Sequence, residues 1–277
     1  MGSSAGKSSL RQHILSVRHW AHFNPHYSGK SGKEGYTLLQ GRIHSIESMG
    51  LVDGPGIRTV VFMQGCHLRC KYCHNPDTWQ LMSGKELLLT PEELLKKLLR
   101  FKPYYADNGG VTFSGGEPLL QKDFLIKCLS LCRENHIHTC LDTAGCGNGD
   151  YEEILSLTDL VLLDIKHYTA EGFRAVTGCS PDESLRFLDI LQGSEVPIWI
   201  RHVVVPGLTY DDAHLQGLMK YLQTLKNIKK VELLPYHTLG VIKYHSLGIP
   251  YPLEGVSALS SEELADWQEQ FNRLSEP

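Results

Sequence analysis

The chain has 277 residues, of which 42% are hydrophobic and 21% charged, and its formal net charge is −4. This size and composition fit one large soluble domain. The slight acidic balance provides no field to attract nucleic acid or an anionic membrane, and no apolar run approaches the roughly 18 residues of a membrane span. Eight cysteines in a long chain without a secretory h-region indicate a reduced, intracellular compartment.

Residues 1–40 differ in composition from the rest of the chain. No Asp or Glu occurs before Glu34, and Leu10, Ile14, Val17 and Trp20 recur at helical spacing among basic residues. This pattern is typical of an organelle transit peptide, but a disordered extension or a start codon placed too early fits it equally well. We therefore divide the chain into an N-terminal extension, 1–40, and a core domain, 41–277. We expect a cytoplasmic protein, with organelle import as the alternative.

Beyond residue 41, short β-rich runs alternate with longer helical patterns. The predicted strands cover 57–64, 110–114, 137–142, 159–165, 196–204 and 230–235. The predicted helices cover 122–135 and 151–157, and others begin near Thr90, Ser180, Asp211 and Ser260. Thr90 with Glu93 predicts a capping box, and Ser180 opens a second Ser-Pro-x-Glu sequence of the same kind.

These segments make six strand–helix units. Strands separated by helices pair in parallel through right-handed crossovers, and a closed barrel of this kind takes eight units. Six units therefore predict an α/β fold, a partial (β/α)6 barrel that is open along one side. An open side suits a macromolecular substrate.

Three cysteines, Cys66, Cys70 and Cys73, follow the first predicted strand at the spacing C-x3-C-x2-C. Thiolates this close together are suited to an iron–sulfur cluster or zinc, because soft sulfur ligands favour these metals. Three ligands are one fewer than an electron-transfer cluster or a structural zinc normally takes. The open coordination position predicts a metal centre that binds substrate.

Polar residues also follow the other predicted strands. They are the segment 114–117, Asp142 with Thr143, Asp164 with Lys166, Arg201, and His237. Active sites of parallel barrels lie at the carboxyl ends of the strands, so these groups are predicted to share one rim with the cysteines. A structural Asp–Lys pair is the alternative for Asp164 and Lys166, and Arg201 is also compatible with a role in bracing the barrel.

The remaining cysteines are interpreted as structural. Cys128 and Cys132 lie one helical turn apart beside leucines, which favours core packing. A zinc site made of Cys132, His136, His138 and Cys140 is disfavoured, because these residues span a helix end and a strand whose side chains alternate between faces.

The motifs resemble those of the radical S-adenosylmethionine (SAM) enzymes. In chain order the matching segments are 41–45, 52–58, 70–79, 114–118, 141–143, 163–166 and 233–240. The flanking residues narrow the resemblance to the activating enzymes of glycyl-radical enzymes, most closely to the branch that acts on pyruvate formate-lyase. That family has the (β/α)6 fold.

The resemblance implies that Cys66, Cys70 and Cys73 hold a [4Fe–4S] cluster and that SAM binds its fourth iron. Reductive cleavage would then give methionine and a 5′-deoxyadenosyl radical. It further implies that Gly116 receives the amino group of SAM and that Asp142, Thr143 and Asp164 bind a monovalent cation. The residues expected around SAM are Tyr72, Cys73, His74, Asp164, Ile165, Lys166 and His237. Lys166 would complement the carboxylate of SAM, and His237 would contact its adenine or ribose.

The resemblance also implies partners. The expected substrate is a glycine loop of pyruvate formate-lyase, the expected electron donor is of the flavodoxin or ferredoxin type, and the chain is expected to be a monomer without nucleic-acid or membrane partners. The alternatives are an activase of another glycyl-radical enzyme, such as anaerobic ribonucleotide reductase, and a radical SAM enzyme with a small-molecule substrate. A ferredoxin-type carrier is disfavoured because it needs a fourth cluster cysteine.

Overall fold

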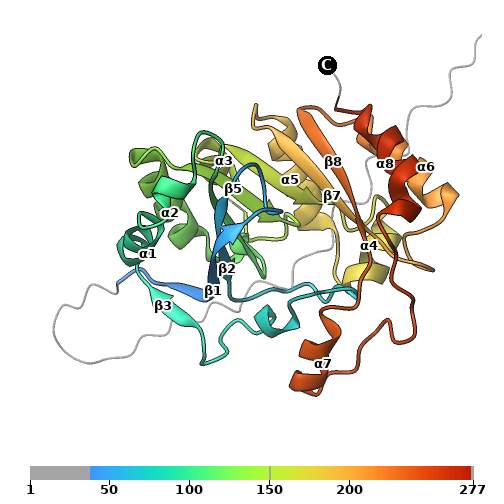
Figure 1. Ribbon diagram of the computed structural model, residues 1–277, viewed down its shortest axis with the longest axis horizontal. Helices are drawn as coiled ribbons and strands as arrows, with labels where there is room; N and C mark the ends of the chain where they lie inside the picture. The colour runs from blue at the N-terminus through green and yellow to red at the C-terminus, as the bar shows by residue number, and fades with distance from the viewer. Residues whose placement is uncertain (1–37, 150, 276–277) are drawn as a thin grey trace, which may run out of the picture. The chain divides into compact units, whose positions relative to one another are not determined.

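The computed structural model describes residues 38–149 and 151–275, and the stretch with helical spacing at 10–23 lies outside them. The described chain forms one eight-stranded sheet with the order β3-β1-β2-β4-β5-β6-β7-β8 (Figure 1). The strands are β1 (Gly41–Gly50), β2 (Arg58–Met63), β3 (Leu87–Leu89), β4 (Gly110–Gly115), β5 (His138–Thr143), β6 (Leu160–Asp164), β7 (Ile198–Val204) and β8 (Ile228–Pro235).

Six of these strands run parallel in chain order, from β2 through β4, β5, β6 and β7 to β8. They coincide with the six strands predicted from the sequence, and the predicted (β/α)6 arrangement is confirmed. Because each strand follows its neighbour through a helix, all six carboxyl ends lie along one edge of the sheet.

Strands β1 and β3 were not predicted. β1 pairs antiparallel with β2 on one side and with the three-residue β3 on the other. Much of β1 is only half-buried, so its sequence lacks the clear apolar run of the central strands. These two strands extend the sheet beyond the six-stranded unit.

Most of the helices cover the outer face of the sheet (Figure 1). The helices are α1 (Pro91–Leu98), α2 (Lys122–Glu134), α3 (Tyr151–Ser156), α4 (Ala170–Thr177), α5 (Asp182–Gln192), α6 (Asp212–Leu222), α7 (Val241–Leu247) and α8 (Ala265–Asn272). Helix α7 lies apart from the sheet, against the turn at Pro76–Thr78 (Figure 1). Sequence analysis missed α4 and α7, which have only eight and seven residues. None of the helices in the described ranges is both long and apolar enough to cross a membrane.

Two predicted helix starts are confirmed by reciprocal hydrogen bonds. The Thr90 hydroxyl accepts from the Glu93 N–H, and the Glu93 carboxylate accepts from the Thr90 N–H. Ser260 and Glu263 exchange the same pair of bonds before α8. Each box satisfies two amide groups that a helix terminus would otherwise leave unpaired.

The predicted capping box at Ser180 is wrong, although the helix that it announced exists. Helix α5 begins at Asp182 after Pro181, without a side-chain cap. The carboxylate that would have closed the box, that of Glu183, instead accepts a hydrogen bond of 2.7 Å from the Tyr151 hydroxyl of α3. A tertiary contact has therefore replaced a local one.

The main core lies between the sheet and the helices. Cys128 and Cys132 are buried in it beside Leu125 and Leu129, as predicted. Cys140 faces the opposite side of the sheet, where it packs with leucines of β6. This difference in direction separates Cys140 from Cys132 and supports the rejection of a zinc site there.

Candidate functional site

A cavity of about 590 Å³ lies at the carboxyl ends of the six parallel strands. The predicted site residues that line it are Cys66, Cys70, Tyr72, Cys73, His74, Gly116, Asp142, Thr143, Asp164, Lys166, Arg201 and His237. Ile165 is the exception, because it belongs to the core between sheet and helices. Residues spread over 170 positions of the sequence thus meet around one space.

The loop that carries the cysteines is held by the end of α4. The N–H groups of Arg69 and Lys71 donate to the carbonyls of Thr177 and Val176, at 2.8 and 3.0 Å. The Arg69 guanidinium donates to the Cys66 carbonyl at 2.8 Å. The two backbone bonds use carbonyls that the last turn of a helix leaves free, and together with the guanidinium bond they fix the loop between the cysteines.

The thiols of Cys66 and Cys70 are buried, and that of Cys73 is half-buried. Burial raises the pKa of Cys66 and of Cys73, and it raises that of Cys70 to about 12. All eight cysteines, each within the described chain, are free. Metal ligation needs the thiolate form, which burial disfavours. The positive charge of a bound metal would therefore have to stabilise the thiolates.

The arrangement fits a cluster better than a single ion. Among the described residues, no group of three or more His, Cys, Asp or Glu side chains could hold one metal ion. The three thiolates of a [4Fe–4S] cluster bind three different irons and therefore stand farther apart than ligands of one ion. The donor set, three cysteines on one short loop, fits such a cluster with one iron left open.

Two ion pairs cross the floor of the cavity. The Lys166 Nζ lies 2.8 Å from Asp164 Oδ2, and the Arg201 Nη1 lies 3.3 Å from Asp142 Oδ1. Burial opposes charge on Asp164, but Lys166 and Arg201 outweigh it and lower its pKa. Burial raises the pKa of Asp142 despite Arg201. The cavity floor therefore holds two cations, Lys166 and Arg201, and two carboxylates. Asp164 is the harder of the two carboxylates to protonate and Asp142 the easier.

Glu117 joins the ends of β4 and β5, a role that sequence analysis missed. Its buried carboxylate accepts from the Thr143 hydroxyl at 2.6 Å and from the Ala144 N–H at 3.1 Å. Directly before it, Gly116 lies so close to the Gly65 carbonyl that a Cβ atom would overlap it. The Gly-Gly-Glu sequence thus brings bare backbone against the cysteine loop, and a buried acid after two glycines could have signalled it.

His74 and His237 stack at the edge of the cavity, with ring centroids 4.0 Å apart. Burial and the neighbouring His237 lower the pKa of His74 to about 4, and burial lowers that of His237. Both rings are therefore neutral at pH 7. They present a flat, uncharged surface that suits a planar heterocycle.

Val52 and Asp53 of the segment 51–57 line the same space, and Asp53 was not named as a site residue. The Thr112 hydroxyl donates to the Asp53 carbonyl at 2.6 Å. The fully buried Arg58 donates to the Thr112 hydroxyl at 2.6 Å and to the Pro55 carbonyl at 3.0 Å. The Asp-Gly-Pro-Gly sequence between two strands was the available signal for this loop.

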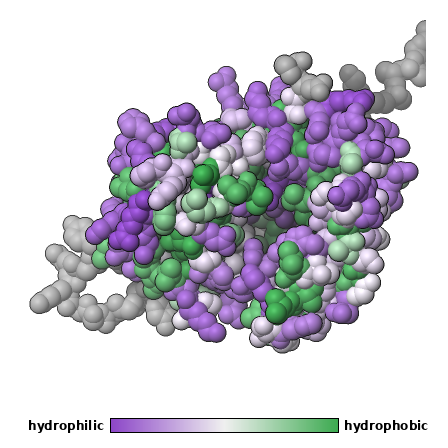
Figure 2. Space-filling model, in the orientation of Figure 1, coloured by the Kyte–Doolittle hydropathy of each residue, from purple (hydrophilic) through white to green (hydrophobic). Residues whose placement is uncertain are grey.

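The cavity has apolar borders. Val52 lines it and is 75% exposed, and its neighbour Leu51 is 71% exposed. Near His237, Leu239 and Ile242 are 79% and 70% exposed. Figure 2 shows hydrophobic side chains gathered on this face, near α7 and around the hollow at its centre. Large exposed apolar side chains around a cavity are typical of a surface that meets another macromolecule.

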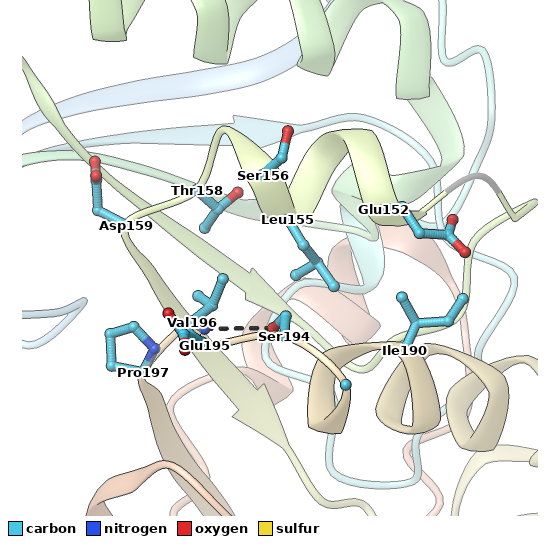
Figure 3. Close-up of a pocket in the computed structure, with 11 residues that line it drawn as sticks. Glu152, Leu155, Ser156, Thr158, Asp159, Ile190, Ser194, Glu195, Val196 and Pro197 are labelled. Carbon is cyan, nitrogen blue, oxygen red and sulfur yellow. Dashed lines mark hydrogen bonds between the residues drawn. The ribbon is translucent and has the colours of Figure 1, made fainter.

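A second hollow, of about 560 Å³, lies at the opposite end of the strands. Figure 3 shows Asp159 and Pro197, which precede β6 and β7, together with residues of α3 and α5. The Val196 N–H donates to the Ser194 hydroxyl at 3.3 Å on its wall. No residue predicted to be functional lines this groove.

Comparisons with known proteins agree with these features. Residues 60–218 match the family model of the radical SAM superfamily. The chain is 56% identical over 240 residues to the pyruvate formate-lyase-activating enzyme of Clostridium pasteurianum, covering 86% of this chain and all of that protein. It is 49% identical over 231 residues to the enzyme of the same name from Streptococcus mutans, covering 81% and 88%.

Solved structures with lower identity share the fold. SuiB of Streptococcus suis, in its complex with the precursor peptide SuiA, matches 81% of this chain and 46% of its own with a TM-score of 0.60 and 17% identity. A radical SAM methyltransferase from Sphaerobacter thermophilus matches 79% of this chain and 65% of its own with a TM-score of 0.56 and 15% identity.

Proposed function

Since the chain belongs to the pyruvate formate-lyase-activating enzymes of the radical SAM superfamily, we propose that it generates the glycyl radical of pyruvate formate-lyase. The observation that carries the proposal is the meeting of three cysteines, two buried and one half-buried, with the Lys166–Asp164 pair and the Gly116 backbone in one cavity. Members of the superfamily use a [4Fe–4S] cluster and SAM. Under this proposal the enzyme is an oxidoreductase whose substrate is a glycine of another protein.

Each part of the cavity receives a role. Cys66, Cys70 and Cys73 would hold the cluster, which with SAM supplies a 5′-deoxyadenosyl radical upon reduction. Lys166 would complement the SAM carboxylate, and the backbone at Gly116 would accept from its ammonium group. The stacked rings of His74 and His237 would border the adenine or ribose, beside Tyr72. Ile165 would contribute through its backbone only, because its side chain lies in the core.

A monovalent cation at Asp142, Thr143 and Asp164 is part of the proposal. Asp142 and Asp164 line the same cavity, and each contacts one cationic side chain. The buried Oδ1 atom of Asp142 lies 3.3 Å from Arg201 Nη1 but accepts no hydrogen bond, so it has capacity for a further ligand. The Thr143 hydroxyl donates to Glu117 and accepts from the Gly145 N–H at 2.8 Å, which leaves one lone pair for a further ligand.

The protein's share of the chemistry is positioning and protection. A primary carbon radical abstracts hydrogen from most groups within reach, so the target must lie in van der Waals contact and water must be kept out. The loop 51–57, fixed through Arg58, would close one side, and the exposed apolar residues Leu51, Val52, Leu239 and Ile242 would meet the partner. A glycine on an inserted loop suits this opening because a buried glycine could not enter it.

Finer partners are also proposals. We propose a flavodoxin- or ferredoxin-type electron donor, a monomeric enzyme, and a cytoplasmic location, with a core domain at 41–277. Transit through the extension, 1–40, is the alternative. A fluorescent reporter carrying residues 1–35 would be diffuse if the first view holds and would enter an organelle if the second does.

The test is anaerobic incubation with pyruvate formate-lyase, SAM and a reductant, read by EPR for a glycyl radical. Deuterium placed on the target glycine should appear in 5′-deoxyadenosine. An alternative partner, anaerobic ribonucleotide reductase, serves as the control and should give no signal. If no deuterium is transferred while SAM is still cleaved, the small-molecule alternative takes the place of this proposal.

A further inference from the structure

Three histidines lie behind the cavity, on the side of the sheet that α6 covers. His202 on β7 is fully buried, His214 on α6 is 7% exposed, and His167 directly follows Lys166. The His202 and His214 rings stack with centroids 5.2 Å apart, and the His167 and His214 rings meet edge to face at 4.7 Å. None of the three lines the cavity at the carboxyl ends of the strands.

The hydrogen bonds of this cluster determine which ring nitrogens of His202 and His214 donate and which accept. The Nδ1 atom of His202 lies 2.7 Å from the Ile165 carbonyl, which can only accept, so Nδ1 carries the proton. The Nε2 atom of His202 must then accept, and Nε2 of His214 donates to it across 3.1 Å. The backbone of His214 is held separately at the first turn of α6, where the Asp211 side chain caps the helix by accepting from the His214 backbone N–H at 2.7 Å.

The chain of bonds ends on the residue between the two charged groups of the cavity. The Ile165 carbonyl accepts from His202, and its N–H donates to the Arg201 carbonyl at 3.0 Å. Asp164 and Lys166, on either side, both line the cavity, whereas Ile165 faces the core. A rotation of the peptide between Ile165 and Lys166 would turn the ammonium group away from the cavity.

The residues after Lys166 are held by close packing. A Cβ atom on Gly172 would overlap the His167 ring, and one on Gly217 of α6 would overlap the Tyr168 hydroxyl. Tyr168 also lies against His214, with ring centroids 5.2 Å apart. Gly172 and Gly217 therefore leave room for the His167 and Tyr168 rings, whose packing holds the segment that follows β6 in place.

We propose that His202 is a positioning residue for SAM: its bond to the Ile165 carbonyl, supported by His214, directs Asp164 and Lys166 into the cavity. This inference rests on the proposed placement of SAM beside those two residues. A role in packing alone would be served by an apolar ring, and burying an imidazole is costly unless both of its nitrogens are bonded, as they are here.

The experiment compares three variants of the anaerobically reconstituted enzyme. His202→Phe keeps a ring but removes the donor, His202→Asn places an amide N–H near the position of Nδ1, and His202→Gln places one near that of Nε2. The measurement is the SAM dissociation constant, taken from the change in the cluster's EPR signal, together with iron content and the thermal midpoint. We expect His202→Phe and His202→Gln to weaken SAM binding about tenfold, His202→Asn to recover most of it, and iron content to stay constant.

Two comparisons keep the inference separate from stability and from the proposed function. Leu218→Ala removes a fully buried side chain of α6, so it should lower the thermal midpoint without changing SAM affinity. Equal SAM affinity in the Asn and Gln variants, or an equal loss in Leu218→Ala, would overturn the positioning role. If Asp164→Ala and Lys166→Ala weaken SAM binding while His202→Phe does not, only this inference fails. If none of them does, the placement of SAM itself is wrong.

Discussion

The two ends of the parallel sheet carry hollows of similar size and different chemistry. The cavity at the carboxyl ends measures about 590 Å³ and the groove at the amino ends about 560 Å³. In the cavity, Lys166 pairs with Asp164, and Arg201 pairs with Asp142, all largely withdrawn from water. The groove has three exposed acidic residues and no Lys, Arg or His on its walls. Volume alone therefore does not mark a site, whereas buried and compensated charge does.

The carboxylates at the two ends of β6, Asp159 and Asp164, have different surroundings. Asp159, before β6, accepts from the Thr139 N–H at 2.8 Å and from its hydroxyl at 3.0 Å. It thereby gives the backbone N–H of Thr139, near the start of β5, a hydrogen-bond partner. Asp164, five residues later at the other end of β6, faces a cavity with cations on two sides. A structural acid thus precedes β6, and the acid at the end of the strand is the one proposed to lie beside SAM.

The largest expected effect is the loss of any one thiol from the cavity. Cys66→Ala should abolish the cluster and SAM cleavage together, because the cluster would keep only two of the three protein thiolates that hold it. Iron content and 5′-deoxyadenosine formation measure the outcome. Cys128→Ala, in the core behind the sheet, is the matched control and should retain both activities. A Cys66→Ala enzyme that cleaves SAM at the normal rate would falsify the cluster assignment.

Arg201→Met should have the next largest effect, on stability. It leaves Asp142 buried without the cation that now lies at 3.3 Å, and removing one partner of a buried pair costs about 3–5 kcal/mol. Denaturant titration under anaerobic conditions measures the free energy of unfolding. Adding Asp142→Asn should restore part of it, since the uncompensated charge is then gone. No recovery in the double variant would show that the pair does not act as a unit.

The sequence predicted those parts of the fold whose signal is local. The central strands are short apolar runs, and the Thr90 and Ser260 caps are bonded within four residues, so each could be read in isolation. Helix α4 was missed although Thr169 caps its start and Gly178 ends it in the left-handed conformation. Its contact with the cysteine loop, through carbonyls that accept from Arg69 and Lys71 about a hundred positions earlier, could not be read locally because the partners are distant in the sequence. The Ser180 box failed for the same reason, since Glu183 bonds to α3.

The site divides in the same way. Cysteine spacing and the polar residues after each strand identified the groups that line the cavity. Strand alternation already indicated that Ile165 faces away from Asp164 and Lys166, but spacing could not reveal that Glu117 joins two strands or that Arg58 is buried under the 51–57 loop. These roles depend on which neighbour a side chain meets across the sheet, and no periodicity in the sequence encodes that.

Charge removal on the cavity floor should affect SAM more than the metal. In Lys166→Ala, a charge-assisted contact is lost, which corresponds to about 1.5–3 kcal/mol and thus a roughly 10- to 100-fold weaker binding of SAM. Asp164→Ala should act in the same direction through its partner. Iron content should not change, because neither residue is expected to bind the cluster. Loss of iron in either variant would make the pair structural and favour the alternative interpretation.

The histidines behind the cavity should make stability depend on pH. Burial lowers the pKa of His202 to about 3 and that of His214 to about 4, whereas the pKa of a histidine in the unfolded chain is about 6.5. Between these values the unfolded state binds more protons, so the free energy of unfolding falls as pH decreases, by at most about 1.4 kcal/mol per pH unit for each histidine. A variant with His202→Asn and His214→Gln should show a shallower slope between pH 7 and 5.5 in denaturant titrations. An unchanged slope would contradict the neutral forms assigned here.

The smallest effect belongs to the groove at the amino ends. Glu152 and Glu195 are exposed there, and no cation contacts either of them among the described residues of its wall. Neutralising an exposed acid without a partner changes stability by no more than about 0.5 kcal/mol. Glu152→Gln and Glu195→Gln should therefore match the unmodified enzyme in unfolding free energy, SAM affinity and glycyl-radical yield, although they alter a hollow as large as the cavity. A lower radical yield with unchanged SAM affinity would mean that this face takes part in the encounter with a protein partner, and the contrast between the two ends would no longer hold.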